Sequence, residues 1–248
     1  MPVLIAGSRK CLCKAIIFDK DGTLLDSSAA ISALGRERFH AIQEVAGAEA
    51  ACRWQKWVGF DAESGRVDPN GPLSLASKRD EGAIAAAAIY QGGIPWIQAL
   101  LLSNRAYALA DSRLRSPYGF QVLPGIPDVL RRLRDAGFLL AVATTDQQAR
   151  TRETLNDLGI GIWLDAILAA DDVTNGKPAP DMVLETCKRL GMEPAEATVV
   201  GDTEADMRMG RAAGVALCVG VKTGLNRGSG LDGLADVILD SVAQLSTV

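Results

Sequence analysis

Acidic residues stand close together at two separate places in the sequence. Asp19 and Asp21 lie two positions apart in the run DKDGTLLD, and Asp202 lies in the run GDTEAD. Carboxylate oxygens are the hard ligands that Mg²⁺ prefers, and a site with few carboxylates leaves room for water and a phosphate. A carboxylate can also attack phosphorus and form an aspartyl-phosphate, which divides one difficult transfer into two easier ones. These residue types therefore point to phosphoryl-transfer chemistry assisted by a divalent cation.

The sequence also contains the cations and donors that such chemistry needs. Negative charge spreads over the oxygens of a transferring phosphoryl group, so positive groups and aligned donors must surround it. Lys177, the Thr144 hydroxyl and the backbone N–H groups around Gly22 can act in this way. A second carboxylate can protonate a leaving alkoxide and then deprotonate the attacking water. His40 is the one histidine of the chain, which excludes a His–His metal site.

The candidate residues follow short apolar runs, which we predict to be strands. These runs cover residues 14–18, 138–143, 163–169, 197–200, 215–219 and 235–239. Helical patterns lie between them, near residues 126–133, 147–158, 180–190 and 205–213. Short apolar runs that alternate with helices predict an α/β fold, with a Rossmann-like doubly wound parallel sheet. Ligands bind such sheets beyond the carboxyl ends of the strands, where the candidate residues stand.

The alternation stops between the first two predicted strands. There the pattern is helical at residues 29–45, around Trp54 and at 83–110, with a Pro/Gly-rich piece at 64–77. We expect residues 27–119 to form an inserted, mainly helical cap domain, and residues 1–26 and 120–248 to form the α/β core.

Three further features have ordinary structural interpretations. Asp146 and Asp181 stand at the N-termini of predicted helices and are expected to be helix caps. The glycine-rich run 220–230 lacks the GK[ST] ending of a P-loop, so we expect a connection from a strand to a helix.

The clusters at the predicted strand ends resemble, in order and position, the four motifs of the haloacid dehalogenase superfamily of phosphohydrolases. DxDGTLxD at residues 19–26 is the most specific, and GKPxPD and GDxxxD support it. The resemblance covers the core, whereas the insertion matches in position and helical character. It implies that Asp19 is the nucleophile, that Asp21 is the general acid/base, and that Thr144 and Lys177 complete the catalytic set.

The same resemblance implies the binding roles. Mg²⁺ is the implied cofactor, and its ligands would be the carboxylates of Asp19 and Asp202 and the main-chain carbonyl of Asp21. Asp206 lies one helical turn after Asp202 and would support the metal site from there. The phosphate would be held by Gly22, Thr144, Thr145 and Lys177.

Several activities within that superfamily compete. Dehalogenases and phosphonatases lack an aspartate two positions after the nucleophile, so Asp21 disfavours both. A β-phosphoglucomutase-like phosphosugar mutase keeps that aspartate, but its fourth motif commonly reads EDSxxG. GDTEAD is more usual in phosphoglycolate phosphatase-like enzymes, which favours a phosphatase for a small phosphorylated metabolite, such as phosphoglycolate or a sugar phosphate. A non-catalytic phosphate-binding or structural protein is the alternative from another class.

Composition restricts the partners. A net charge of −4 and a pI near 5.2 disfavour binding to nucleic acid or anionic lipid. Five scattered cysteines do not form a secreted disulfide framework, and we expect them to be reduced. The apolar stretch 82–102 is interrupted by Gly92, Gly93 and Pro95, which predicts two helices instead of a membrane span. We therefore expect a cytoplasmic monomer or homodimer that meets a small-molecule phosphate ester.

Overall fold

The computed structural model describes residues 1–248, which fold into two compact units. Met1–Ser27 and Gln121–Val248 form the first unit, and Ser28–Phe120 form the second. None of the helices combines the length and the apolar character that a membrane span requires.

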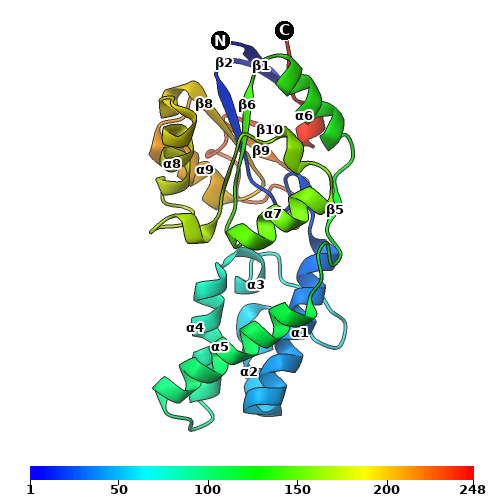
Figure 1. The fold of residues 1–248 in the computed structure, drawn as a ribbon, viewed down its shortest axis with the longest axis vertical. Helices are drawn as coiled ribbons and strands as arrows, with labels where there is room; N and C mark the ends of the chain where they lie inside the picture. The colour runs from blue at the N-terminus through cyan, green and yellow to red at the C-terminus, as the bar shows by residue number, and fades with distance from the viewer. The chain divides into compact units, whose positions relative to one another are not determined.

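A six-stranded sheet forms the centre of the first unit (Figure 1). Its strand order is β10-β9-β8-β3-β6-β7, and every neighbouring pair is parallel. The strands are β3 (Ala15–Phe18), β6 (Leu139–Ala143), β7 (Ala166–Leu168), β8 (Ala197–Gly201), β9 (Leu217–Val221) and β10 (Val237–Leu239). All residues of β3, β8 and β9 are buried, as expected for parallel strands that are covered on both faces. The predicted α/β fold with a parallel sheet is confirmed.

Four helices accompany this sheet. They are α6 (Ile126–Asp135), α7 (Gln148–Asp157), α8 (Asp181–Leu190) and α9 (Glu204–Ala213). Helices α8 and α9 lie side by side and pack on one face, where Met182 and Met207 join a core cluster with Ile17 of β3 (Figure 1). Because side chains alternate along a strand, Ile16 and Phe18 point to the opposite face. Short 3₁₀ turns cover Gly161–Trp163, Ala170–Asp172, Pro194–Glu196 and Val242–Gln244.

Two small antiparallel sheets were not expected. Strands β1 (Val3–Ala6) and β2 (Arg9–Leu12) form a hairpin, and β11 (Ser246–Thr247) pairs with β1. The expectation that residues 14–18 hold the first strand of the chain is therefore wrong. Strands β4 (Leu25–Asp26) and β5 (Gln121–Val122) pair where the chain leaves and re-enters the first unit. All these strands have two to four residues, too few to show a clear alternation in the sequence.

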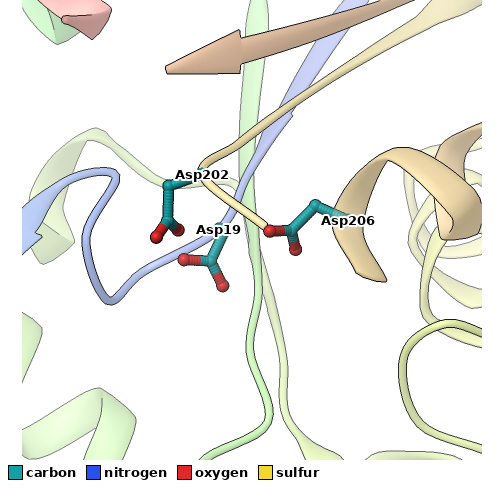
Figure 2. Close-up of side chains that lie close together, drawn as sticks. All are labelled: Asp19, Asp202 and Asp206. Atoms are coloured by element: carbon teal, nitrogen blue, oxygen red, sulfur yellow. The ribbon is translucent and has the colours of Figure 1, made fainter. Parts of the chain in front are cut away.

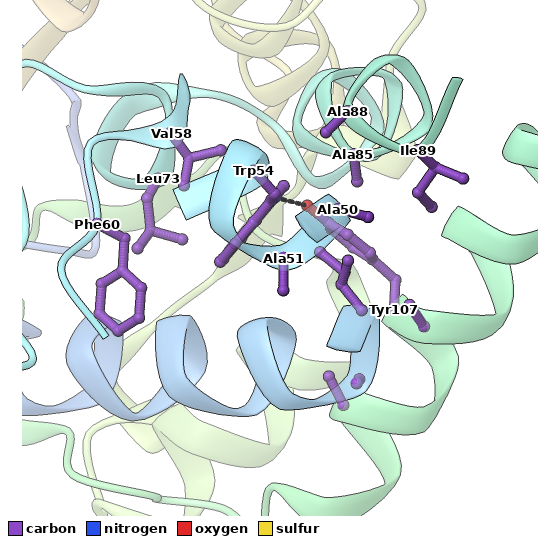
Figure 3. Packing of buried hydrophobic residues seen from close by; sticks show 14 of the residues in the cluster. Ala50, Ala51, Trp54, Val58, Phe60, Leu73, Ala85, Ala88, Ile89 and Tyr107 are labelled. Carbon is purple, nitrogen blue, oxygen red and sulfur yellow. Dashed lines mark hydrogen bonds between the residues drawn. The ribbon is translucent and has the colours of Figure 1, made fainter. Parts of the chain in front are cut away.

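The second unit is helical. Its elements are α1 (Ser28–Ala46), α2 (Ala48–Val58), α3 (Pro72–Leu75), α4 (Lys78–Tyr90) and α5 (Trp96–Arg113). Trp54 is fully buried among alanines, and its indole N–H donates to the Tyr107 hydroxyl at 3.2 Å (Figure 3). The helical structure is interrupted between α4 and α5 at residues 91–95, as the glycines and Pro95 predict. The buried ion pair of Arg38 and Glu81 completes this core.

Candidate active site

The carboxyl ends of β8, β3 and β6 bring the predicted site residues together. Phe18 at the end of β3 is paired with Val200 on β8 and Val142 on β6, so the three strands end at nearly the same level. The next residue, Asp19, keeps this alignment because its backbone N–H donates to the Val200 carbonyl at 2.8 Å. Asp202 and Thr144 follow the neighbouring strands at the same edge of the sheet.

Three buried carboxylates meet at this edge. Asp19, Asp202 and Asp206 each offer an oxygen atom, and these atoms lie within 4.8 Å of one another (Figure 2). Asp206 is held by the first turn of α9, where its carboxylate accepts from the Thr203 backbone N–H at 3.0 Å. The Thr203 hydroxyl in turn accepts from the Asp206 N–H, which makes a capping box.

Lys177 joins two of these carboxylates. Its ammonium nitrogen lies 2.5 Å from Oδ1 of Asp19 and 2.6 Å from Oδ1 of Asp206. The loop that carries Lys177 is fastened by Asp181, whose carboxylate accepts from the Asn175 side-chain amide at 3.0 Å. The expectation that Asp181 caps a helix is wrong, because Asp181 is the first residue of α8 and the capping position belongs to Pro180.

Crowding and burial change the acidity of the carboxylates. Burial raises the pKa of Asp19 to about 7; the Lys177 ammonium opposes this shift, while the Asp206 and Asp21 carboxylates add to it. Burial also raises the pKa of Asp202 well above its ordinary value, and the Asp19 and Asp206 carboxylates act in the same direction. A cluster of hard oxygen donors that repel one another in this way fits a divalent cation such as Mg²⁺.

Asp21 lies beside this cluster and is held by a residue that the sequence interpretation missed. The ammonium nitrogen of Lys20 lies 3.1 Å from Oδ2 of Asp21 and 3.0 Å from Oδ2 of Asp146, and its side chain is fully buried. Burial lowers the pKa of Lys20, but the two carboxylates outweigh it and raise the pKa above its ordinary value. A lysine two positions after the end of a fully buried strand needs buried partners, and this is the signal that could have identified it.

Asp146 is not a helix cap, contrary to expectation. The capping position of α7 belongs to Gln147, and Asp146 faces Lys20 and, at 3.6 Å, Arg150. Burial raises the pKa of Asp146, but Lys20, Arg150 and the Gln147 N–H together lower it below its ordinary value. Asp146 is therefore an ionised partner of a buried lysine.

Thr144 and Thr145 follow β6 with different exposure. Thr144 is buried, and its hydroxyl accepts from the Asp146 N–H at 3.2 Å, whereas Thr145 is half-buried. Thr144 thus lies within the same network as Asp146.

Gly22 lies against Asp202 with a φ of +82°. A Cβ at Gly22 would lie 2.6 Å from Oδ2 of Asp202, so a side chain there would collide with that carboxylate. The hydroxyl of Thr23 donates to Oδ1 of Asp202 at 3.3 Å.

The glycine-rich run 220–230 contributes to the site, which the sequence interpretation also missed. The Thr223 hydroxyl donates to the Gly22 carbonyl at 2.6 Å, and a Cβ at Gly224 would lie 1.7 Å from Oδ2 of Asp202. The run consists largely of turns that lead to β10, so the expected connection to a helix is wrong. The functional signal was the pair Thr223–Gly224, which begins two positions after the end of a buried strand.

Comparisons with known proteins agree with this geometry. A family model described as haloacid dehalogenase-like hydrolase matches residues 13–214. The phosphoglycolate phosphatase of Pseudomonas putida is 30% identical over 220 residues, which cover 88% of this chain and 73% of that protein. The phosphoglycolate phosphatase of Escherichia coli K12 is 28% identical over 94% of this chain and 90% of its own length.

A solved structure shows the same fold. The crystal structure of a predicted phosphoglycolate phosphatase from Haemophilus somnus has a TM-score of 0.69 and 20% identity, with coverage of 94% of this chain and 96% of that one. The family model and the P. putida relative carry the assignment of the family, since they span most of the chain. The chain belongs to the haloacid dehalogenase-like hydrolases and is an enzyme of their phosphoglycolate phosphatase-like group.

Proposed function

We propose that this enzyme is a Mg²⁺-dependent phosphatase that hydrolyses the phosphoric monoester of a small metabolite through an aspartyl-phosphate on Asp19. The observation that carries the proposal is the contact of Lys177 with Asp19 and Asp206 inside a cluster of three buried carboxylates. The phosphoglycolate phosphatase relatives favour a small substrate such as phosphoglycolate or a sugar phosphate.

In the first step, a carboxylate oxygen of Asp19 attacks phosphorus while the bond to the leaving oxygen breaks. Asp21 donates a proton to that oxygen, so that an alcohol departs instead of an alkoxide. Burial raises the pKa of Asp21 even though Lys20 opposes the shift, which favours a proton on this carboxyl group. Lys177 and the Thr144 hydroxyl would hold the phosphoryl oxygens during transfer.

In the second step, Asp21 takes a proton from a water molecule that attacks phosphorus. The bond between phosphorus and Asp19 breaks, which releases inorganic phosphate and restores both carboxyl groups. Asp19, Asp202 and the main-chain carbonyl of Asp21 would hold the cation, with Asp206 beside them. When bound, Mg²⁺ offsets the repulsion between the phosphate and these carboxylates.

Phosphate release from p-nitrophenyl phosphate, with Mg²⁺ and then with excess EDTA, tests this proposal. Activity should disappear with EDTA and in Asp19→Asn, while Asp157→Asn should match the unmodified enzyme, since Asp157 is exposed at the end of α7. Activity that survives both EDTA and Asp19→Asn would contradict the mechanism.

A panel of phosphoglycolate and sugar phosphates then identifies the substrate class. Release of one inorganic phosphate for each substrate molecule consumed supports a phosphatase. An isomerised sugar phosphate without free phosphate would assign a mutase instead.

A further inference from the structure

Lys20 is a buried cation that lies in the sequence between Asp19 and Asp21. Its side chain is 0% exposed, whereas Asp21 is partly accessible. Removing a charge from water is strongly unfavourable unless close partners compensate, so a lysine in this position must be held by fixed carboxylates. Lys20 meets this condition through Asp21 and Asp146.

Asp146, the second partner of Lys20, is held in place by contacts of its own. Asp146 accepts from the Gln147 N–H at 2.8 Å and lies 3.6 Å from Arg150 on the first turn of α7. Asp146 is therefore tied to the start of a helix, and Lys20 extends this support to Asp21 across the neighbouring strands β6 and β3.

The two oxygens of Asp21 have different surroundings. Oδ2 lies 3.1 Å from the Lys20 ammonium nitrogen, whereas Oδ1 is buried and has no hydrogen-bond partner. A buried oxygen without a partner is costly in a folded protein and is usual only where a ligand or water completes it.

We infer that Lys20 is a positioning residue, which holds Oδ2 of Asp21 so that Oδ1 is the oxygen that exchanges a proton with the substrate. This inference rests on the proposed function, in which Asp21 is the general acid/base. Lys20 itself touches no reacting atom. A role limited to stability is the competing explanation, and buried ion pairs are often replaceable by apolar side chains without loss of stability.

The two explanations differ in how the effect of Lys20→Met depends on the leaving group. An alkyl phosphate needs a proton on its leaving oxygen, whereas nitrophenolate departs readily without one. Lys20→Met should lower kcat/KM for the alkyl substrate by roughly 10²-fold and for p-nitrophenyl phosphate by less than about tenfold. Lys14→Met is the matched control, because Lys14 precedes the same strand at its other end and pairs with Glu196 at 2.7 Å.

A double-mutant cycle with Asp21→Asn completes the test. If Lys20 acts through Asp21, adding Lys20→Met to Asp21→Asn should change the alkyl rate by less than about twofold. If Lys20→Met fails to fold, Asp146→Asn replaces it, because asparagine has the same shape as the aspartate that holds Lys20. Asp146→Asn should also lower kcat/KM more for the alkyl substrate than for p-nitrophenyl phosphate, but by a smaller factor.

The outcomes separate the inference from the proposed function. Equal losses on both substrates, unchanged rates, or additive losses in the cycle would overturn the positioning role while the phosphatase stands. An unmodified enzyme that hydrolyses neither ester with Mg²⁺ would overturn the proposed function, and the positioning role with it.

Discussion

The ammonium nitrogen of Lys177 lies 2.5 Å from Oδ1 of Asp19, although 158 positions separate the two residues. The contact joins the loop after β7 to the end of β3, two strands that are not neighbours in the sheet. Lys177 is also 2.6 Å from Asp206, so a single cation balances charge from two other parts of the chain.

Lys177→Met should weaken both catalysis and folding. Removing one partner of a buried ion pair costs about 3–5 kcal/mol, because Asp19 and Asp206 would lose their cation. Loss of a positive group that faces the phosphoryl oxygens should lower kcat by roughly 10²–10³-fold. Urea unfolding and steady-state kinetics measure the two effects, with the exposed Lys188→Met as control. A variant with unchanged stability and rate would show that the contact is dispensable.

The metal-free protein should lose stability as the pH rises, because of Asp19. Its pKa is about 7 in the fold against an ordinary value of 3.8, so below about pH 4 it is protonated in both states. Between these values the folded state keeps a proton that the unfolded state has lost, and the free energy of unfolding falls with rising pH.

Asp19→Asn removes this titration. It should stabilise the metal-free protein by about 1–3 kcal/mol at pH 8 and have little effect at pH 4. Urea unfolding in EDTA over this pH range measures the difference. An equal effect of the substitution at both pH values would exclude Asp19 as the source.

Mg²⁺ should raise the melting temperature, and more strongly at pH 8 than at pH 5. A ligand that binds only the folded state at a hundredfold excess over its Kd adds about 2.7 kcal/mol. Carboxylates must be deprotonated to bind a metal, and burial raises the pKa of Asp202 well above its ordinary value. Asp202→Asn should abolish most of the shift and Asp157→Asn none of it. A shift that persists in Asp202→Asn would place the cation elsewhere.

Gly224→Ala should damage the site because its Cβ would lie 1.7 Å from Oδ2 of Asp202. Relief of this overlap must move the backbone or the carboxylate, which we expect to cost about 1–3 kcal/mol and to weaken the response to Mg²⁺. Gly82→Ala is the matched control, since Gly82 lies inside α4 with a nearest neighbour at 3.9 Å. That control should stabilise the protein by about 0.5–1 kcal/mol. Full Mg²⁺ binding by Gly224→Ala would show that the site adapts.

The order of strands and helices in the first unit was predictable because each element follows a local rule. Continuous apolar runs such as 138–143 form strands that are buried on both faces, and the glycines at 137 and 159 adopt positive φ just after helices. The grouping of Asp19, Thr144, Lys177 and Asp202 follows from the same rules, since parallel strands share one carboxyl edge. The pairing of β1 with β11 was not predictable, because it joins the two ends of the chain. The hairpin of β1 and β2 is local, but its strands of four residues are too short to show a clear alternation.

The sequence by itself determined which chemical groups stand at the strand ends: carboxylates, hydroxyls and a lysine, with no second histidine. Only the tertiary structure decided which of them touch. Lys20 meets Asp146 across 126 positions and Thr223 meets Gly22 across 201, and no local pattern marks either pair. Contacts at such separations depend on strand order, register and burial, which arise from the packing of the whole unit. The buried lysine beside Asp21 is therefore a property of the fold, although its neighbours in the sequence are the most recognisable residues of the chain.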